Sequence, residues 1–194
     1  MVRSIIILNI LVFVLWYVYP NPEFMAQNFL VSWSGLAAGR FWTLLTSVFS
    51  HNSAFHILIN LYVFSGFGGF LEAFLGARRF LTLYLAAGIG GSLLHCLVSA
   101  TLLAEPALPA LGASGAICGI ILYFSLAFPA EKVLILGVIP VPAIWGAILL
   151  AGLDVWGLVS QAQGSGLPIG HGAHLGGAFT GLIFFLLRRR EPIV

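Results

Sequence analysis

One serine and a few imidazole and amide side chains are the groups in this apolar chain that could do chemistry. Ser114 lies among small residues in Gly112 to Ala116 (GASGA), so another backbone could come close to its hydroxyl group. His174 could take the proton from a serine hydroxyl and later give it to a leaving amine. This pair is the minimum for nucleophilic acyl transfer, if the fold brings the two side chains together.

Acyl transfer also needs hydrogen-bond donors for the oxyanion of the tetrahedral intermediate. His56 and Asn60 are four residues apart, so on a helix they would share one face. Their side chains and the backbone N–H of Ser114 could supply such donors. We expect no carboxylate near a histidine at this depth, because Asp154 is placed near the outer end of its segment and Glu72 near the inner end of another. A Ser–His dyad is therefore favoured over a triad.

The composition identifies the chain as an integral membrane protein. Of the 194 residues 60% are hydrophobic and only 7% are charged, whereas soluble domains average about 25% charged residues. So few charges cannot cover a surface that faces water. The short run Arg188 to Arg190 gives no sign of nucleic-acid binding. Cys96 and Cys118 lie in apolar runs and are interpreted as small buried residues rather than a disulfide or a metal pair.

Charged residues divide the sequence into apolar segments, each close to the roughly 20 residues that cross a bilayer as a helix. Backbone groups in lipid must be hydrogen-bonded within the segment, so helices are expected. The sequence predicts an all-α polytopic membrane protein, a bundle of six transmembrane helices forming one domain over 1–194. The six spans are placed at 4–19, 54–75, 80–103, 113–129, 134–157 and 172–187.

The basic residues predict how these spans are oriented. With six spans, all of the basic residues except Arg40 fall on one side of the membrane, and positive charge is typical of the cytoplasmic side. Both termini are then expected in the cytoplasm. The second, fourth and sixth spans run in the same direction, and counting along each helix places Asn60, Ser114 and His174 in one layer in the outer half of the membrane. Polar groups at such depth are functional candidates.

Each of these residues also has a structural interpretation that the sequence leaves open. Ser114 could bond its own helix backbone, and Asn60 could join two helices. Four histidines could bind a metal, but the HExxH motif is absent and no carboxylate is expected to complete such a site, so no metal is predicted. The histidines in question are His51, His56, His171 and His174.

At these residues the sequence resembles the rhomboid family of intramembrane serine proteases. A GxSG motif alone is weak evidence, but an HxxxN motif on an earlier span and an AH dipeptide before a GxxxG on a later span make the combination highly specific. The matching stretches are HNSAFHILIN (His51 to Asn60), GFGGFLE (Gly66 to Glu72), GASG (Gly112 to Gly115) and AHLGGAFTG (Ala173 to Gly181).

The resemblance implies roles for individual residues. Ser114 would be the nucleophile and His174 the general base, while His56, Asn60 and the N–H of Ser114 would form the oxyanion hole. The last span would pack on the fourth span through two glycines. The long segment 20–53 would be a first loop embedded in the membrane, and the fifth span with the loop after it would be the gate for a substrate helix. The packing glycines are Gly177 and Gly181.

The sequence departs from the family pattern at three places. Many members have Trp-Arg in the first loop, whereas here Thr43 follows Trp42. Some members have a tyrosine four residues after the serine, stacked on the histidine, and here that position is Cys118. His171 occupies a position that is polar in some members. The roles of Cys118 and His171 are left open.

The resemblance implies an intramembrane serine endopeptidase that cleaves membrane-protein substrates within or next to their transmembrane helices. Its partners would be these substrate helices and membrane lipid, without nucleic acid, metal or organic cofactor. The minimal core and the absence of organelle targeting favour a bacterial inner membrane. The alternative is a catalytically inactive rhomboid-like protein that binds transmembrane helices; a small transporter or channel is disfavoured because no inverted repeat is evident.

Overall fold

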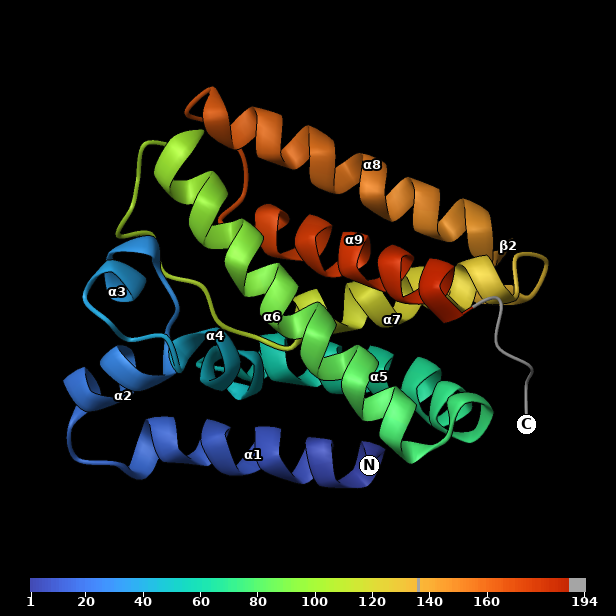
Figure 1. Ribbon diagram of the computed structural model, residues 1–194, viewed down its shortest axis with the longest axis horizontal. Helices are drawn as coiled ribbons and strands as arrows, with labels where there is room; N and C mark the ends of the chain where they lie inside the picture. The colour runs from blue at the N-terminus through green and yellow to red at the C-terminus, as the bar shows by residue number, and fades with distance from the viewer. Residues whose placement is uncertain (136, 189–194) are drawn as a thin grey trace.

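The computed structural model describes residues 1–135 and 137–188 as a bundle of helices with one small β-hairpin (Figure 1). Helices α6, α7 and α9 lie in the middle of the bundle, with α1 and α8 at opposite edges. In chain order the elements are α1 (Val2–Val18), α2 (Pro22–Phe29), α3 (Trp33–Ala37), α4 (Thr43–Thr46), the 3₁₀ helix η1 (Ser47–Phe49), α5 (Ala54–Leu75), α6 (Ala77–Thr101), α7 (Ser114–Ala127), β1 (Lys132–Ile135), β2 (Ile139–Pro142), α8 (Ala143–Ala162) and α9 (His171–Arg188).

Glycines bring α7 and α9 into backbone contact. A Cβ atom added at Gly177 would overlap the carbonyl oxygen of Gly115, and one added at Gly181 would overlap that of Gly119. Lipid gives helices no hydrophobic reason to associate, so such close contact between small residues is what holds them together. The pairing of Gly177 with Gly115 also sets the register of the two helices, since it places the start of α9 beside Ser114.

The apolar core lies where α5, α6 and α7 meet. Its largest members are aromatic, and the ring of Phe64 contacts the rings of Phe80 and Tyr84 with centroids 6.0 and 5.2 Å apart. Helix α1 packs beside α5, and the amino group of Met1 lies 2.6 Å from the carboxylate of Glu72. These contacts join α1 and α6 to α5, and both α5 and α6 pack against α7.

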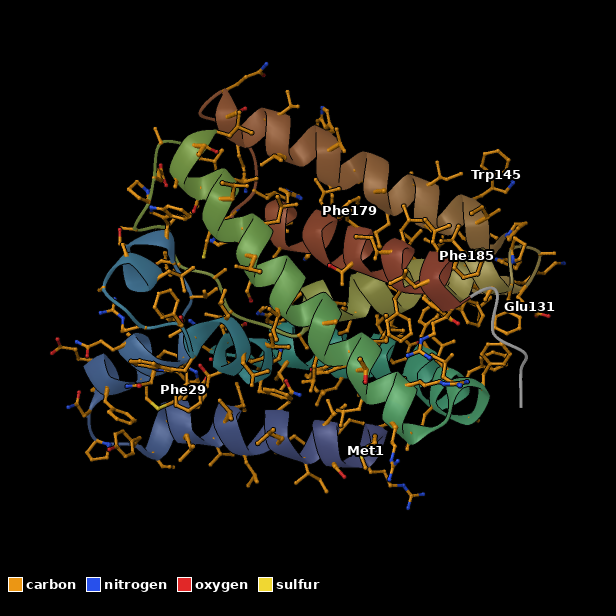
Figure 2. All side chains as sticks on the ribbon, in the orientation of Figure 1. Met1, Phe29, Glu131, Trp145, Phe179 and Phe185 are labelled. Carbon is orange, nitrogen blue, oxygen red and sulfur yellow. The ribbon has the colours of Figure 1, made fainter. Side chains whose placement is uncertain are left out.

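Helix α8 is held far less firmly than the central helices. Of its 20 residues only four are buried, namely Ala143, Ala147, Asp154 and Gly157. Three of these are small, and the remaining one is a carboxylate. Figure 2 shows Trp145 pointing outward from this helix, and its side chain is 61% exposed. The packing of α8 therefore depends on few apolar contacts and on the polar contacts of Asp154.

The segment between α1 and α5 folds into short helices that gather at one end of the bundle, away from the β-hairpin (Figure 1). It is tied to the chain that precedes α7 by backbone hydrogen bonds. Val31 and Ala110 exchange two bonds of 2.9 and 2.8 Å, and the N–H of Gly112 donates to the carbonyl of Ser47 at 2.9 Å. This first loop therefore fixes the segment that leads into Ser114.

Three helices of the described chain, α5, α6 and α8, are long and apolar enough to cross a membrane, judged by length and composition. Helices α1 and α7 are apolar but shorter. Five of the six predicted spans coincide with helices to within one turn at each end. The prediction of a helical span over 134–157 is wrong at both ends, because the hairpin occupies its start and α8 continues to Ala162.

The hairpin has a local physical cause. Strands β1 and β2 pair antiparallel, with Val133 opposite Val141, and Gly137 in the turn has a φ of +76° that favours glycine. Pro140 and Pro142 lack the N–H that a helix would use. Apolar composition alone does not separate such a strand pair from the start of a helix, because both are rich in branched apolar residues.

Candidate active site

Ser114 and His174 are in hydrogen-bond contact. Ser114 is the first residue of α7 and His174 lies in the first turn of α9, and the distance from Ser114 Oγ to His174 Nε2 is 3.0 Å. Both side chains are half-buried. The glycine contacts between α7 and α9 hold this geometry, because Gly115 follows Ser114 directly and Gly177 lies one turn after His174. A hydroxyl and an imidazole so arranged can pass a proton between them.

Asp154 contacts the other ring nitrogen of His174, on the side of the imidazole away from Ser114. Its Oδ1 lies 2.8 Å from His174 Nδ1, and the carboxylate is 7% exposed. A carboxylate only accepts hydrogen bonds, so Nδ1 of His174 donates and carries the proton. Nε2 then keeps its lone pair and faces the hydroxyl of Ser114. Ser114, His174 and Asp154 therefore have the connectivity of a serine–histidine–aspartate triad.

The expectation that no carboxylate lies near a histidine is thus wrong. Its cause is the misplaced fifth span, which was expected to end at 157 and left Asp154 near the membrane edge. Helix α8 continues to Ala162, so Asp154 lies eight residues, or roughly 12 Å, before its end. Asp154 is the only aspartate in the sequence, and its position inside an apolar segment was the available signal.

His171 shares the same carboxylate oxygen. Its Nδ1 lies 2.7 Å from Asp154 Oδ1, and the side chain is buried. The ring occupies the space that a side chain at Gly157 would fill, because a Cβ atom there would overlap it. Asp154 and Gly157 are three residues apart on one face of α8. One face of α8 therefore holds both histidines of α9, and this contact of His171 answers the question that the sequence left open.

Two of the three oxyanion donors expected from the sequence, His56 and the N–H of Ser114, lie at the start of α7. A Cβ atom at Gly112 would lie 2.7 Å from Cε1 of His56, and Gly112 has a φ of +120°, so glycine is required there. The His56 ring therefore lies against the loop that leads into Ser114. The first N–H groups of a helix have no acceptor within it, and the positive end of the helix dipole lies there. The N–H of Ser114 lies in this first turn, and its role as an oxyanion donor stays a prediction.

Asn60 makes a local contact instead. Its Nδ2 donates to the carbonyl of His56 at 2.9 Å, one turn earlier in α5. This bond supports the helix that carries His56, and an amide nitrogen has a second N–H that remains for another acceptor. The role of Asn60 as an oxyanion donor stays a prediction.

His51 supports the same loop from the other side. It is fully buried, its ring contacts that of His56 with centroids 4.9 Å apart, and its Nε2 accepts the N–H of Ala113 at 3.4 Å. Burial, and to a smaller extent the neighbouring His56, lower the pKa of His51 from 6.5 to about 3. His51 is therefore neutral in the folded protein, as an acceptor must be. Sequence reasoning gave it no role of its own.

The four histidines considered from the sequence as a metal site do not come together as one group of ligands in the described residues. In residues 1–135 and 137–188, three possible metal ligands come together, Cys118, Asp154 and His174, with ligand atoms within 4.8 Å of one another. Of the four histidines only His174 belongs to this group. Its ring nitrogens are engaged by Asp154 and Ser114, which is the arrangement of a proton relay.

Comparison with known proteins gives consistent matches over most of the chain. The family model described as "Rhomboid domain" matches residues 38–191. RHOMBOID-like protein 12, mitochondrial, of Arabidopsis thaliana is 36% identical over 197 residues, which cover 94% of this chain and 56% of that protein. Rhomboid protein 1, mitochondrial, of Saccharomyces cerevisiae is 31% identical over 188 residues, covering 95% of this chain and 52% of that protein.

A vertebrate relative agrees with these two. Presenilin-associated rhomboid-like protein A, mitochondrial, of Danio rerio is 31% identical over 205 residues, covering 100% of this chain and 50% of that protein. The chain thus spans about half the length of the curated relatives it matches. The prediction of a bacterial inner membrane with cytoplasmic termini is wrong, because these relatives are mitochondrial proteins and a further match, 33% identical, is chloroplastic.

Proposed function

The chain belongs to the rhomboid family, and on that premise we propose that it is an intramembrane serine endopeptidase. It cleaves peptide bonds within or next to the transmembrane helices of membrane-protein substrates. The observation that carries the proposal is the 3.0 Å contact between Ser114 Oγ and His174 Nε2. Rhomboid proteins are generally intramembrane serine proteases, and this contact supplies the nucleophile and base that such a reaction needs.

The reaction begins at the hydroxyl of Ser114. Its oxygen attacks the carbonyl carbon of the scissile bond while His174 Nε2 takes the hydroxyl proton. The oxyanion that forms is stabilised by the N–H of Ser114 and by His56. His174 then gives the proton to the nitrogen of the leaving amine, and the C–N bond breaks to leave an acyl-enzyme. A water molecule, deprotonated by the same histidine, hydrolyses the acyl-enzyme and restores Ser114.

Asp154 influences these reaction steps through His174. Its hydrogen bond to Nδ1 keeps the imidazole in the tautomer that can accept from Ser114, and its charge stabilises the imidazolium formed during the reaction. Asp154 is therefore a positioning residue. The site is then better described as a triad than as the dyad expected from the sequence.

The reaction limits which substrate segments can be cleaved. A carbonyl inside a regular helix is already hydrogen-bonded, so the substrate must unwind locally before Ser114 can reach it. Small or helix-breaking residues near the cleaved bond favour this unwinding.

We place six helices across the membrane as one domain, and an organellar membrane agrees with the names of the relatives. No metal or organic cofactor takes part. The membrane helices are α1, α5, α6, α7, α8 and α9.

A serine-reactive phosphonate probe tests the nucleophile directly. The purified protein in detergent should be labelled on Ser114, and labelling should disappear in Ser114→Ala. Ser125→Ala is the matched control, because Ser125 lies on the same helix, is buried, and should leave labelling unchanged. If the wild-type protein is not labelled while it remains folded, the helix-binding function is the better account.

A further inference from the structure

We propose that Cys118, Asp154 and His174 form a binding site for Zn²⁺, and that zinc bound there inhibits the protease. The three residues come from α7, α8 and α9. One ligand atom from each lies within 4.8 Å of the other two. Thiolate sulfur, imidazole nitrogen and carboxylate oxygen are the ligands that Zn²⁺ takes in proteins. Cys118 has no part in the reaction described above.

The geometry needs little adjustment to hold the ion. Tetrahedral zinc, with bonds near 2.0 to 2.3 Å, keeps its ligand atoms about 3.5 Å apart. The three ligand atoms lie within 4.8 Å of one another, so none has to move closer to another by much more than about 1 Å. The oxygen of Asp154 and Nδ1 of His174 are 2.8 Å apart and would separate slightly to admit the ion. Cys118 lies one helical turn after Ser114 and so shares its face of α7. A water molecule can occupy the fourth position.

The charge of Zn²⁺ neutralises the two anionic side chains that would bind it. Cys118 is 8% exposed and Asp154 7% exposed, and an unpaired charge in such surroundings is costly. A Zn²⁺ ion with one thiolate, one carboxylate and one neutral imidazole forms a group of zero net charge. On binding, the thiol of Cys118 releases its proton to solvent. Mg²⁺ and Ca²⁺ require mainly oxygen ligands, so this set excludes them.

Inhibition follows from the chemistry of the imidazole ring. Neutral imidazole has one nitrogen lone pair, and when that pair binds zinc the other nitrogen carries the proton. His174 then has no lone pair left to accept the proton of Ser114, whichever nitrogen holds the metal. Zinc also draws Asp154 away from its hydrogen bond with Nδ1. The inhibition, though not the binding, rests on the proposed function.

Cobalt provides a readout of binding that does not depend on proteolysis. Co²⁺ takes the place of Zn²⁺ in tetrahedral sites, and its bond to a thiolate gives a charge-transfer band in the near ultraviolet. The metal-free protein in detergent should develop this band on titration with Co²⁺, and so should Ser114→Ala. Cys118→Ala and Cys118→Ser should lack it. Cys96→Ala is the matched control, because Cys96 is also buried but lies on α6, and it should retain the band.

Zinc inhibition is measured on cleavage of a transmembrane reporter. Zn²⁺ should inhibit the wild type and Cys96→Ala, EDTA should restore their activity, and Mg²⁺ should have no effect. Cys118→Ala should cleave the reporter but need at least roughly tenfold more zinc for half inhibition, since even a change beyond the ligand shell costs about that much affinity. The absence of a cobalt–thiolate band, or equal inhibition of wild type and Cys118→Ala, would overturn the proposal. A protein that cleaves no reporter but shows the band would contradict the proposed function alone.

Discussion

Oδ1 of Asp154 lies 2.8 Å from Nδ1 of His174, although the two residues are on different helices and the aspartate is buried in an apolar segment. A second histidine, His171, reaches the same oxygen at 2.7 Å. This carboxylate therefore links α8, a helix at the edge of the bundle with only four buried residues, to the imidazole that faces Ser114. The same side chain thus takes part both in orienting the base and in attaching α8.

Replacement of Asp154 should lower turnover more than binding. Asp154→Asn can donate to Nδ1 of His174 and so favour the tautomer with its proton on Nε2, which cannot accept from Ser114. We expect kcat to fall by roughly 10²-fold or more with little change in KM. His171→Gln is the comparison variant and should have a smaller effect, because His171 contacts Asp154 rather than Ser114. Wild-type kcat in Asp154→Asn would exclude a role for the carboxylate.

A methyl group at Gly157 should disturb the same arrangement from α8. A Cβ atom there overlaps the ring of His171, so Gly157→Ala should displace that ring and with it the shared carboxylate. We expect kcat to fall by roughly tenfold to a hundredfold, as small misplacements near a reacting group do. Gly152→Ala on the same helix meets nothing within 4 Å and should behave as wild type. Equal kcat values for the two variants would show that the position of His171 is irrelevant.

The glycine contact between α7 and α9 should be the most sensitive packing site. Gly177→Ala forces a methyl group onto the carbonyl of Gly115, which is backbone and cannot move aside easily. We expect the free energy of unfolding in detergent to fall by at least about 2 kcal/mol, together with loss of cleavage. Gly69→Ala, on α5, has open space at its Cβ position and should be neutral. A stable, active Gly177→Ala would contradict the observed helix contact.

Stability should depend on the protonation of His51. Its pKa is about 3 in the folded protein and 6.5 in the unfolded chain, so between these values only the unfolded chain binds the proton. The free energy of unfolding should therefore fall as the pH is lowered from about 6.5 toward 3. His51→Gln keeps an acceptor for the N–H of Ala113 but does not titrate, so its melting temperature should fall less over this range. If the melting temperatures of wild type and variant fell equally with pH, His51 would not contribute to the pH dependence of stability.

The sequence predicted the contact of serine and histidine for a definite physical reason. A helix rises 1.5 Å per residue, so counting from charged ends placed Ser114 and His174 at the same depth, and in the structure their side chains are in contact. The GxxxG pair Gly177 and Gly181 lies where α9 contacts α7. Regular helices and a fixed membrane thickness make such residues predictable from spacing alone.

Asp154 was missed because its depth depended on a helix boundary. The residues from 133 to 142 have the apolar composition of a membrane helix, and only Pro140, Pro142 and the turn at Gly137 indicate a hairpin. In the structure α8 begins at Ala143 and ends at Ala162, so Asp154 lies well inside the helix and is buried. The meeting of Cys118 with this carboxylate depends on how three helices pack, which residue spacing does not determine.

The most direct test of the account is cleavage of a reporter with a transmembrane helix by the purified protein in liposomes. Wild-type protein should cut the reporter, the cut should survive EDTA, and Ser114→Ala at the same concentration should leave the reporter intact. Ser125→Ala should cut as wild type does. If several such reporters stay intact with folded wild-type protein, or if Ser114→Ala cuts them equally well, Ser114 is not the nucleophile and the account is wrong.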